Sequence, residues 1–115
     1  MIDLQIMQQT LLNRGSSTSL KNKVANSGYM VALYGKEKVI NKLSSKEIRK
    51  YIHNNLKELN KDNIFIGTWV DTNTNKIYLD CSINVQSKEK ALKLAKQNKQ
   101  LAIFDLNSFD SIYLN

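Results

Sequence analysis

The feature that most constrains this chain is a stretch of alternating residues between positions 64 and 85. From Ile77 to Val85 apolar and polar residues alternate without a break. Such alternation is typical of a strand with one buried face and one open face. The segment 64–70 is also strand-like, and residues 72–75, which join the two, are Thr and Asn residues that tolerate turn geometry. The sequence therefore predicts a β-hairpin.

A pairing of Asp71 with Lys76 would set the register of this hairpin. Every apolar residue of the second strand then meets a core-type residue of the first, whereas a shift of one residue would pair core with surface. The face expected to meet the core contains Ile64, Ile66, Thr68, Val70, Ile77, Leu79, Cys81 and Ile83. Cys81 is thus expected to be a packing residue rather than a nucleophile.

The opposite face of the hairpin combines aromatic side chains, carboxylates and a glycine, Gly67. We take five of its residues as a candidate partner-binding surface: Phe65, Trp69, Asp71, Tyr78 and Asp80. Large aromatic side chains are more often buried than displayed, so the alternative is that a helix or the N-terminal segment covers this face. The two carboxylates have several alternative uses, namely bonds to backbone amides, an acidic rim for a protein partner, Mg²⁺ coordination or acid–base chemistry.

Two helices are predicted on either side of the hairpin. Ser44 and Glu47 form a capping box at the start of the first helix. Its inward stripe is expected to contain Ile48, Ile52, Leu56 and Leu59, with Tyr51 at the border. Ser87 caps a second helix, which fades near Asn98.

The remaining elements are strands and an N-terminal segment. Strands are expected at 28–34, 39–40, 100–106 and 111–114, with 39–40 returning against 28–34. Residues 2–13 fit either a strand or a helix, and the helix is slightly favoured because Gln and Met are good helix formers. Residues 16–20 fit a short edge strand.

This order of elements predicts one α+β domain. We expect a mainly antiparallel mixed sheet of about five or six strands with two helices packed on one face. Residues 1–27 are expected to form an N-terminal lead-in segment and loop, and residues 28–115 the α+β core. A length of 115 residues fits a single domain.

The net charge of +7 is concentrated in one half of the chain. Residues 14–61 contain eleven Lys or Arg and three Glu, which gives +8, whereas residues 62–115 contain six of each sign. A basic half favours an anionic partner such as nucleic acid, or an acidic protein surface. The candidate contacts on the outer side of the first helix are Lys46, Arg49, Lys50 and Lys57. The alternative is a solvated helix face.

The sequence contains no combination of residues that indicates catalysis, a metal site or a cofactor. His53 is the only histidine, and it has no cysteine, second histidine or paired carboxylate at ligand spacing. The single cysteine excludes an internal disulfide and is consistent with a cytoplasmic protein. No run approaches the ~20 apolar residues that span a bilayer, and the start lacks a secretory signal. We expect a cytoplasmic, non-enzymatic protein without membrane contact.

Several segments together resemble a small domain found in phage and other mobile-element proteins. They are the runs SGYMVALYG, FIGTWVD, IYLDCSINV, QNKQ and AIFDL, of which GTWVD and YLD are the most specific. The resemblance covers roughly residues 15–115. Cys81 stands where a small apolar residue is common, and Lys99 separates Asn98 from Gln100. The domain often lies at the end of head-morphogenesis or large multidomain phage proteins, and the resemblance implies no activity.

Three non-catalytic functions fit these observations. The preferred hypothesis is inhibition of a host defence nuclease, of the anti-CRISPR or anti-restriction type, in the host cytoplasm. Its partner would be a host protein such as a Cas effector or a restriction nuclease. The alternatives are a nucleic-acid-binding accessory protein and a virion or assembly module. The assembly module would pair with other structural proteins through an exposed sheet edge. The exposed face of the two-stranded hairpin would also allow a homodimer.

Overall fold

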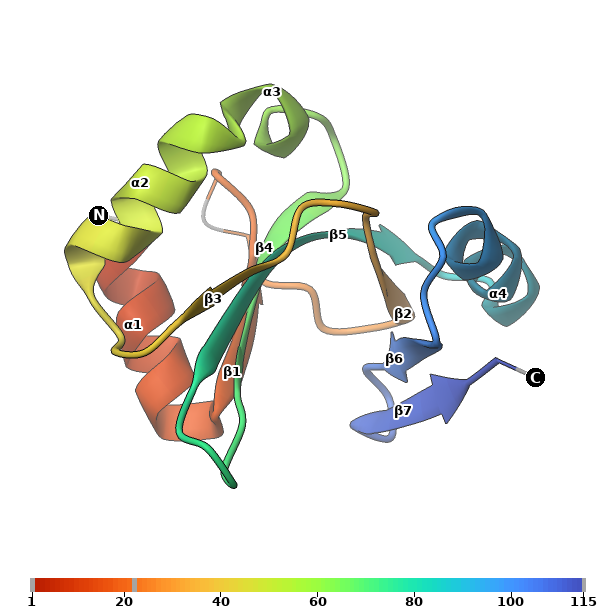
Figure 1. Ribbon diagram of the computed structural model, residues 1–115. Helices are drawn as coiled ribbons and strands as arrows, with labels where there is room; N and C mark the ends of the chain where they lie inside the picture. The colour runs from red at the N-terminus through yellow and green to blue at the C-terminus, as the bar shows by residue number, and fades with distance from the viewer. Residues whose placement is uncertain (1, 22, 115) are drawn as a thin grey trace.

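The computed structural model describes residues 2–21 and 23–114, which form helices and strands of one α+β fold (Figure 1). The helices are α1 (Ile2–Asn13), α2 (Ser45–Asn54), α3 (Leu56–Leu59) and α4 (Lys88–Gln97). The strands are β1 (Gly15–Thr18), β2 (Tyr29–Ala32), β3 (Lys38–Ile40), β4 (Ile64–Val70), β5 (Ile77–Val85), β6 (Ala102–Asp105) and β7 (Asp110–Tyr113). Within the described ranges, no helix is long and apolar enough to cross a membrane.

The described strands form a seven-stranded sheet in the order β1-β4-β5-β2-β6-β7, with β3 pairing with β5 beside this path. Every pairing among them is antiparallel. The central hairpin has the predicted register, including Ile66 opposite Cys81, Gly67 opposite Asp80 and Trp69 opposite Tyr78. The predicted α+β architecture with an antiparallel sheet is confirmed. The short edge strand expected near residue 16 is β1, and the expected central strand is β2, between β5 and β6.

The helices lie on one face of the sheet. Along β5, Leu79, Cys81 and Ile83 point to this face because they alternate with the residues of the other face. The larger core cluster joins Leu79 and Cys81 to residues of α1, α2 and α3, and a second cluster joins Ile83 to α4 through Ala91. In Figure 1, α1 to α3 lie at one end of the sheet and α4 at the other. The opposite face therefore carries no helix in the described part of the chain.

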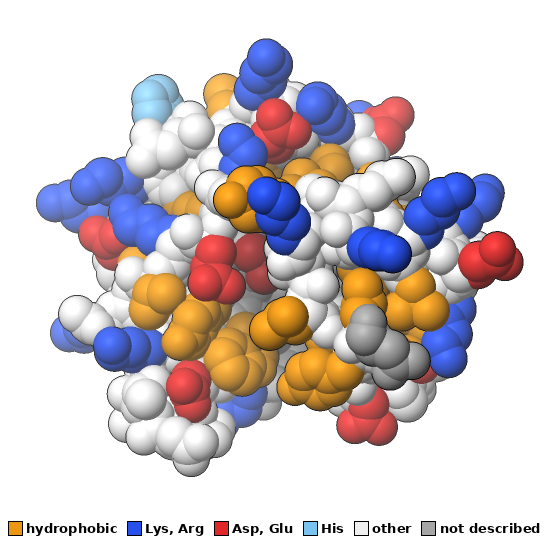
Figure 2. Space-filling view, turned by 45° about the vertical axis from the view of Figure 1, so that its right-hand side comes forward, with side chains coloured by type: hydrophobic (Ala, Val, Ile, Leu, Met, Phe, Trp, Pro, Cys, Tyr) orange, Lys and Arg blue, Asp and Glu red, His pale blue; other side chains and the backbone are white. Residues whose placement is uncertain are grey.

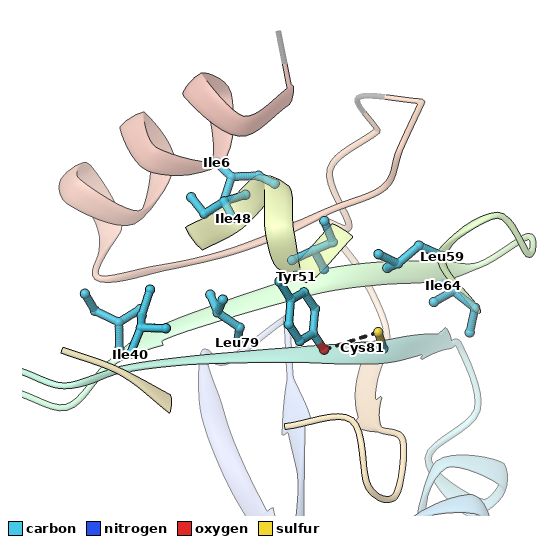
Figure 3. Packing of buried hydrophobic residues seen from close by; sticks show 10 residues of the cluster. Ile6, Ile40, Ile48, Tyr51, Leu59, Ile64, Leu79 and Cys81 are labelled. Atoms are coloured by element: carbon cyan, nitrogen blue, oxygen red, sulfur yellow. Dashed lines mark hydrogen bonds between the residues drawn. The ribbon is translucent and has the colours of Figure 1, made fainter. Parts of the chain in front are cut away.

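Tyr51 occupies the centre of the larger cluster. Its side chain points from α2 toward β5, where the hydroxyl lies 3.3 Å from Cys81 Sγ (Figure 3). The same hydroxyl donates a hydrogen bond of 2.6 Å to the carbonyl oxygen of Lys36. The sequence placed Tyr51 at the border of the inward stripe, but the structure buries it, leaving 2% exposed. Cys81 is buried as predicted.

The helix predicted to begin after Ser44 is α2, and it ends earlier than predicted. Asn55 leaves helical geometry with φ −121°, and its N–H bonds to the carbonyls of Tyr51 and Ile52. The next residues form a separate short helix, α3. Because α3 does not continue the helical path of α2, Leu56 does not lie on the predicted inward stripe. Leu56 is 44% exposed. Its inward placement was therefore wrong, because the periodicity was extended across a break in the helix.

The return strand at residues 39–40 exists as β3, but its predicted partner was wrong. It pairs with β5, placing Ile40 opposite Ile77, instead of with β2. Both strands use the same side of β5, since β2 pairs with residues 82–85 and β3 with residues 77–79. Gly35 lies between them with φ +77°, which favours glycine.

The N-terminal residues belong to the same core and sheet as the rest of the chain. Ile6 of α1 is fully buried in the larger cluster, and β1 pairs with β4. Asp3 fastens α1 to α2, because its carboxylate accepts hydrogen bonds from Ser45 and, at 2.9 Å, from Arg49. Residues 2–18 therefore contribute one helix and one strand to this fold.

Acidification should weaken the hydrogen bonds by which Asp3 holds α1 against α2. The Ser45 hydroxyl, followed by Arg49, holds the pKa of Asp3 below its ordinary value of 3.8 although burial opposes this. A carboxyl group with a lowered pKa contributes stability above its unfolded pKa and loses it as pH falls through the folded pKa. Replacing Asp3 by Asn should lower the free energy of unfolding at pH 7 by about 1–2 kcal/mol. This difference should shrink as the pH falls below 3.8 and through the lowered pKa of Asp3. Urea denaturation across this pH range measures it.

The matched control is Asp62→Asn, since Asp62 is an exposed aspartate. We expect that variant to follow the wild-type curve. A constant difference between wild type and Asp3→Asn at every pH would contradict the stabilising role of the ionised carboxylate.

Candidate protein-binding surface

The helix-free face of the sheet is set by the register of the strands. Residues directly opposite each other in antiparallel strands share a face, so Trp69 and Tyr78 lie on it together with Val39, the β3 partner of Tyr78. Met30 and Phe104 are paired on the same face further along the sheet. This face thus displays aromatic and aliphatic side chains from strands far apart in the sequence.

Trp69 and Tyr78 form an aromatic pair on this face. Their ring centroids are 5.1 Å apart and their planes are tilted by 53°, which is a favourable geometry for two aromatic rings. Trp69 is 55% exposed, and the neighbouring Val39 is 43% exposed. Because Trp has the largest apolar side chain, this exposure leaves a substantial apolar area in contact with water. We call Val39, Trp69 and Tyr78 the aromatic patch.

Figure 2 shows hydrophobic side chains gathered in a band across one face of the molecule, with acidic and basic side chains around it.

Phe65 was expected to belong to the exposed surface and does not. It is 8% exposed and packs with Met30 and Leu106 in a small cluster. The covering alternative therefore holds for Phe65. The cover comes from Met30 of β2, from Leu106 just after β6 and from Ala25 of the N-terminal segment, and not from a helix.

Asp80 lies beside the aromatic patch on the same strand as Tyr78. Its Oδ1 accepts a hydrogen bond of 2.7 Å from Ser82 Oγ. Burial raises the pKa of the Asp80 carboxyl; the Ser82 hydroxyl opposes this shift, and the negative charge of Glu37 adds to it. Among the described residues Asp80 takes part in no ion pair. A cationic group of a partner would stabilise the ionised form of this carboxylate.

Gly67 provides the space in which the Asp80 carboxyl lies. A Cβ atom at Gly67 would overlap Asp80 Oδ1 and lie 3.0 Å from Asp80 Cγ. The backbone of Gly67 has no positive φ, so the glycine is required by this close approach and not by its conformation. The glycine in the GTWVD run therefore has a local steric explanation.

Replacing Gly67 by Ala should lower the free energy of unfolding by about 1–3 kcal/mol, because the methyl group displaces the Asp80 carboxyl from its bond with Ser82. A double-mutant cycle with Asp80→Ala tests the cause. Removing the carboxylate should return most of the stability lost in Gly67→Ala, with a coupling of about 1 kcal/mol or more by thermal or urea denaturation. Additive effects of the two substitutions would contradict this explanation.

Asp71 has a local role at the hairpin loop. Its Oδ1 accepts a hydrogen bond of 3.0 Å from the backbone N–H of Asn73, and its own N–H donates to the Lys76 carbonyl. This is the amide-holding use expected from the sequence. Asp80 holds the Ser82 hydroxyl instead of an amide, so the two carboxylates serve different local purposes. Within the described ranges no group of three or more potential ligand residues is placed to hold a metal ion.

The four basic residues predicted to contact an anionic partner lie on α2 and α3. They are all exposed, but they lie away from the aromatic patch. Arg49 is engaged by Asp3 at 2.9 Å. Lys46, Lys50 and Lys57 form no ion pair with any described residue. They belong to α2 and α3, on the helix-bearing face, whereas Trp69 and Tyr78 lie on the other. The sequence therefore predicted two surfaces that the structure separates.

Val39 belongs to the aromatic patch but was not among the surface residues predicted from the sequence. Its place beside Tyr78 depends on the pairing of β3 with β5, which local patterns did not indicate. Comparisons with protein-family models, with curated proteins and with solved structures find no match to this chain. The resemblance to a phage domain thus remains a prediction from the motif pattern.

Proposed function

We propose that this protein acts without catalysis by binding another protein through the aromatic patch. The observation that carries this proposal is the exposure of Trp69 beside Tyr78 on a face free of described helices. Trp and Tyr dominate the binding energy of many protein interfaces, because they bury a large area and keep a polar group for hydrogen bonding. The Asp80 carboxylate, which has no ion pair among the described residues, adds a preference for a partner with a basic side chain at this position.

The partner we propose is a host defence nuclease, a Cas effector or a restriction enzyme, met in the host cytoplasm. This part of the proposal rests on the GTWVD and YLD segments, whose pattern resembles a domain of phage and mobile-element proteins. Those two segments contain Trp69 and Tyr78, so the most specific part of the pattern supplies both aromatic residues of the patch. Binding that blocks a nuclease requires no catalytic residue in the inhibitor.

An affinity purification tests this proposal. The tagged protein is used to capture partners from infected or producing cells, with and without prior nuclease treatment. We expect a Cas effector or restriction enzyme in both eluates. Eluates that contain only virion structural proteins would favour an assembly module instead.

A second candidate function is direct nucleic-acid binding by Lys46, Lys50 and Lys57. The observation in its favour is that these exposed lysines have no ion-pair partner among the described residues. Lysines that neutralise phosphates release counterions, so such binding depends steeply on salt. In the same purification, partners that disappear after nuclease treatment would support this function and contradict protein binding.

A further inference from the structure

Strand β7 forms one edge of the described sheet, and its outer side is open. It pairs with β6, placing Ile103 opposite Ile112. The N–H of Leu114 bonds to the carbonyl of Leu101 at 2.8 Å. Because bonded and non-bonded pairs alternate in antiparallel strands, Ser111 and Tyr113 turn their N–H and C=O groups away from β6. These groups are free to pair with another strand.

The turn before β7 holds an aromatic residue in an unfavourable conformation. Phe109 has φ +58°, in the left-handed region that bulky residues rarely adopt. Its side chain is 74% exposed. The Phe109 ring makes an edge-to-face contact with the ring of Phe104, with the two centroids 6.4 Å apart. Asn or Gly would fit this backbone with less strain. Residues with strained backbones are concentrated at functional sites, so Phe109 is a candidate binding residue.

Two further properties of this edge bear on what it could bind. Tyr113 is 73% exposed and lies on the helix-free face, since it is the β6–β7 partner of Ala102 and alternates with the inward Ile112. Residues 100–114 contain Asp105 and Asp110 and no Lys or Arg, in a chain whose net charge is +7. The β7 edge is thus an acidic region of a basic protein.

We propose that the free edge of β7 binds an extended basic segment of another protein by strand addition. The backbone groups of Ser111 and Tyr113 pair with the added strand, and Phe109 and Tyr113 pack against its side chains on the helix-free face. Asp110 favours a segment with Lys or Arg, and the same charge opposes the edge-to-edge pairing of two copies of this chain. The residues differ from those of the aromatic patch, so each site can fail its test without the other.

Nuclear magnetic resonance with designed strand peptides tests this proposal on the whole protein. The probe is acetyl-Lys-Val-Lys-Val-Lys-Val-Lys-amide, compared with the same peptide with Glu in place of Lys. The Lys peptide should shift the amide signals of Ser111 and Tyr113 and slow their hydrogen exchange, and the Glu peptide should not. Methylating alternate backbone nitrogens of the Lys peptide should abolish the shifts, because strand addition needs those N–H groups.

Three results would overturn the proposal. They are the absence of shifts at β7 with the Lys peptide, equal shifts with both peptides, and shifts at β7 that grow with protein concentration before any peptide is added. The last result would mean that a second copy of the chain occupies the edge.

The variant Phe109→Asn separates a binding role from a structural one. Asn tolerates the left-handed backbone, so the melting temperature should not fall, while peptide affinity should weaken by about tenfold. A lower melting temperature with unchanged affinity would assign Phe109 to the fold alone. Asp110→Lys provides a second measurement, and it should weaken binding of the Lys peptide and strengthen binding of the Glu peptide.

Discussion

Replacing Tyr51 by Ala should lower the free energy of unfolding by about 3–5 kcal/mol, the range found for removal of a buried aromatic side chain. Tyr51 is 2% exposed and packs in the cluster that joins α1, α2 and α3 to the sheet. Since small domains are stable by only about 5–15 kcal/mol, the loss should lower the melting temperature by about 10–20 °C. Differential scanning calorimetry measures this change directly.

The hydroxyl of Tyr51 should account for a smaller part of this effect. Burial raises the pKa of the Tyr51 hydroxyl far above the usual range for tyrosine, with the bond to Cys81 adding to the shift. The hydroxyl therefore stays protonated and donates to the Lys36 carbonyl at 2.6 Å. Tyr51→Phe should lose about 1–2 kcal/mol, because it leaves this carbonyl without its donor.

The matched control is Tyr34→Ala, since Tyr34 is 61% exposed. Its ring lies 4.9 Å from Lys99 Nζ, a contact worth about 0.5–1 kcal/mol at an exposed site. A Tyr51→Ala protein that melts within a few degrees of Tyr34→Ala would contradict the central place of Tyr51 in the core.

The central hairpin could be predicted from sequence because its information is local. Alternation along β5 fixes which residues share a face, and only one register keeps Ile66, Cys81 and their neighbours together on the core face. The Ser44 and Ser87 caps could be predicted for the same reason, and both side chains accept a bond from the backbone N–H three residues later. These features depend on residues within a few positions of one another.

The features that could not be predicted depend on contacts between distant segments. Phe65 is buried because Met30 of β2 and Leu106, just after β6, reach it from the other side of β5. The same holds for Ile6, which enters the core through packing of α1 on α2 and β4. The break at Asn55 is local, but the helical periodicity continues through it and hides it. For these reasons the binding surface predicted from the sequence includes Phe65, which is buried, and lacks Val39, which is exposed.

Replacing Trp69 by Ala should weaken binding of the proposed protein partner by about thirtyfold or more, the effect typical of an aromatic anchor at an interface centre. The effect on folding should be small. Trp69 is more than half exposed, and its ring pairs with that of Tyr78, a pair worth about 0.5–1.5 kcal/mol. Calorimetry of the variant should therefore show a melting temperature within a few degrees of the wild-type value.

The control for general surface stickiness is Leu11→Ala. Leu11 is 71% exposed on α1, which packs on the helix-bearing face. It removes an exposed apolar side chain of the same +7 protein without touching the aromatic patch. We expect this variant to bind the partner as the wild type does.

The most direct test of the proposed function is quantitative capture from one nuclease-treated lysate by wild type, Trp69→Ala and Leu11→Ala. We predict that wild type and Leu11→Ala retain the partner, and that Trp69→Ala loses it while remaining folded. Equal capture by a folded Trp69→Ala protein would contradict a binding role for the aromatic patch. A Trp69→Ala protein that is unfolded would assign Trp69 to stability, and it would contradict the exposed, weakly packed position described above.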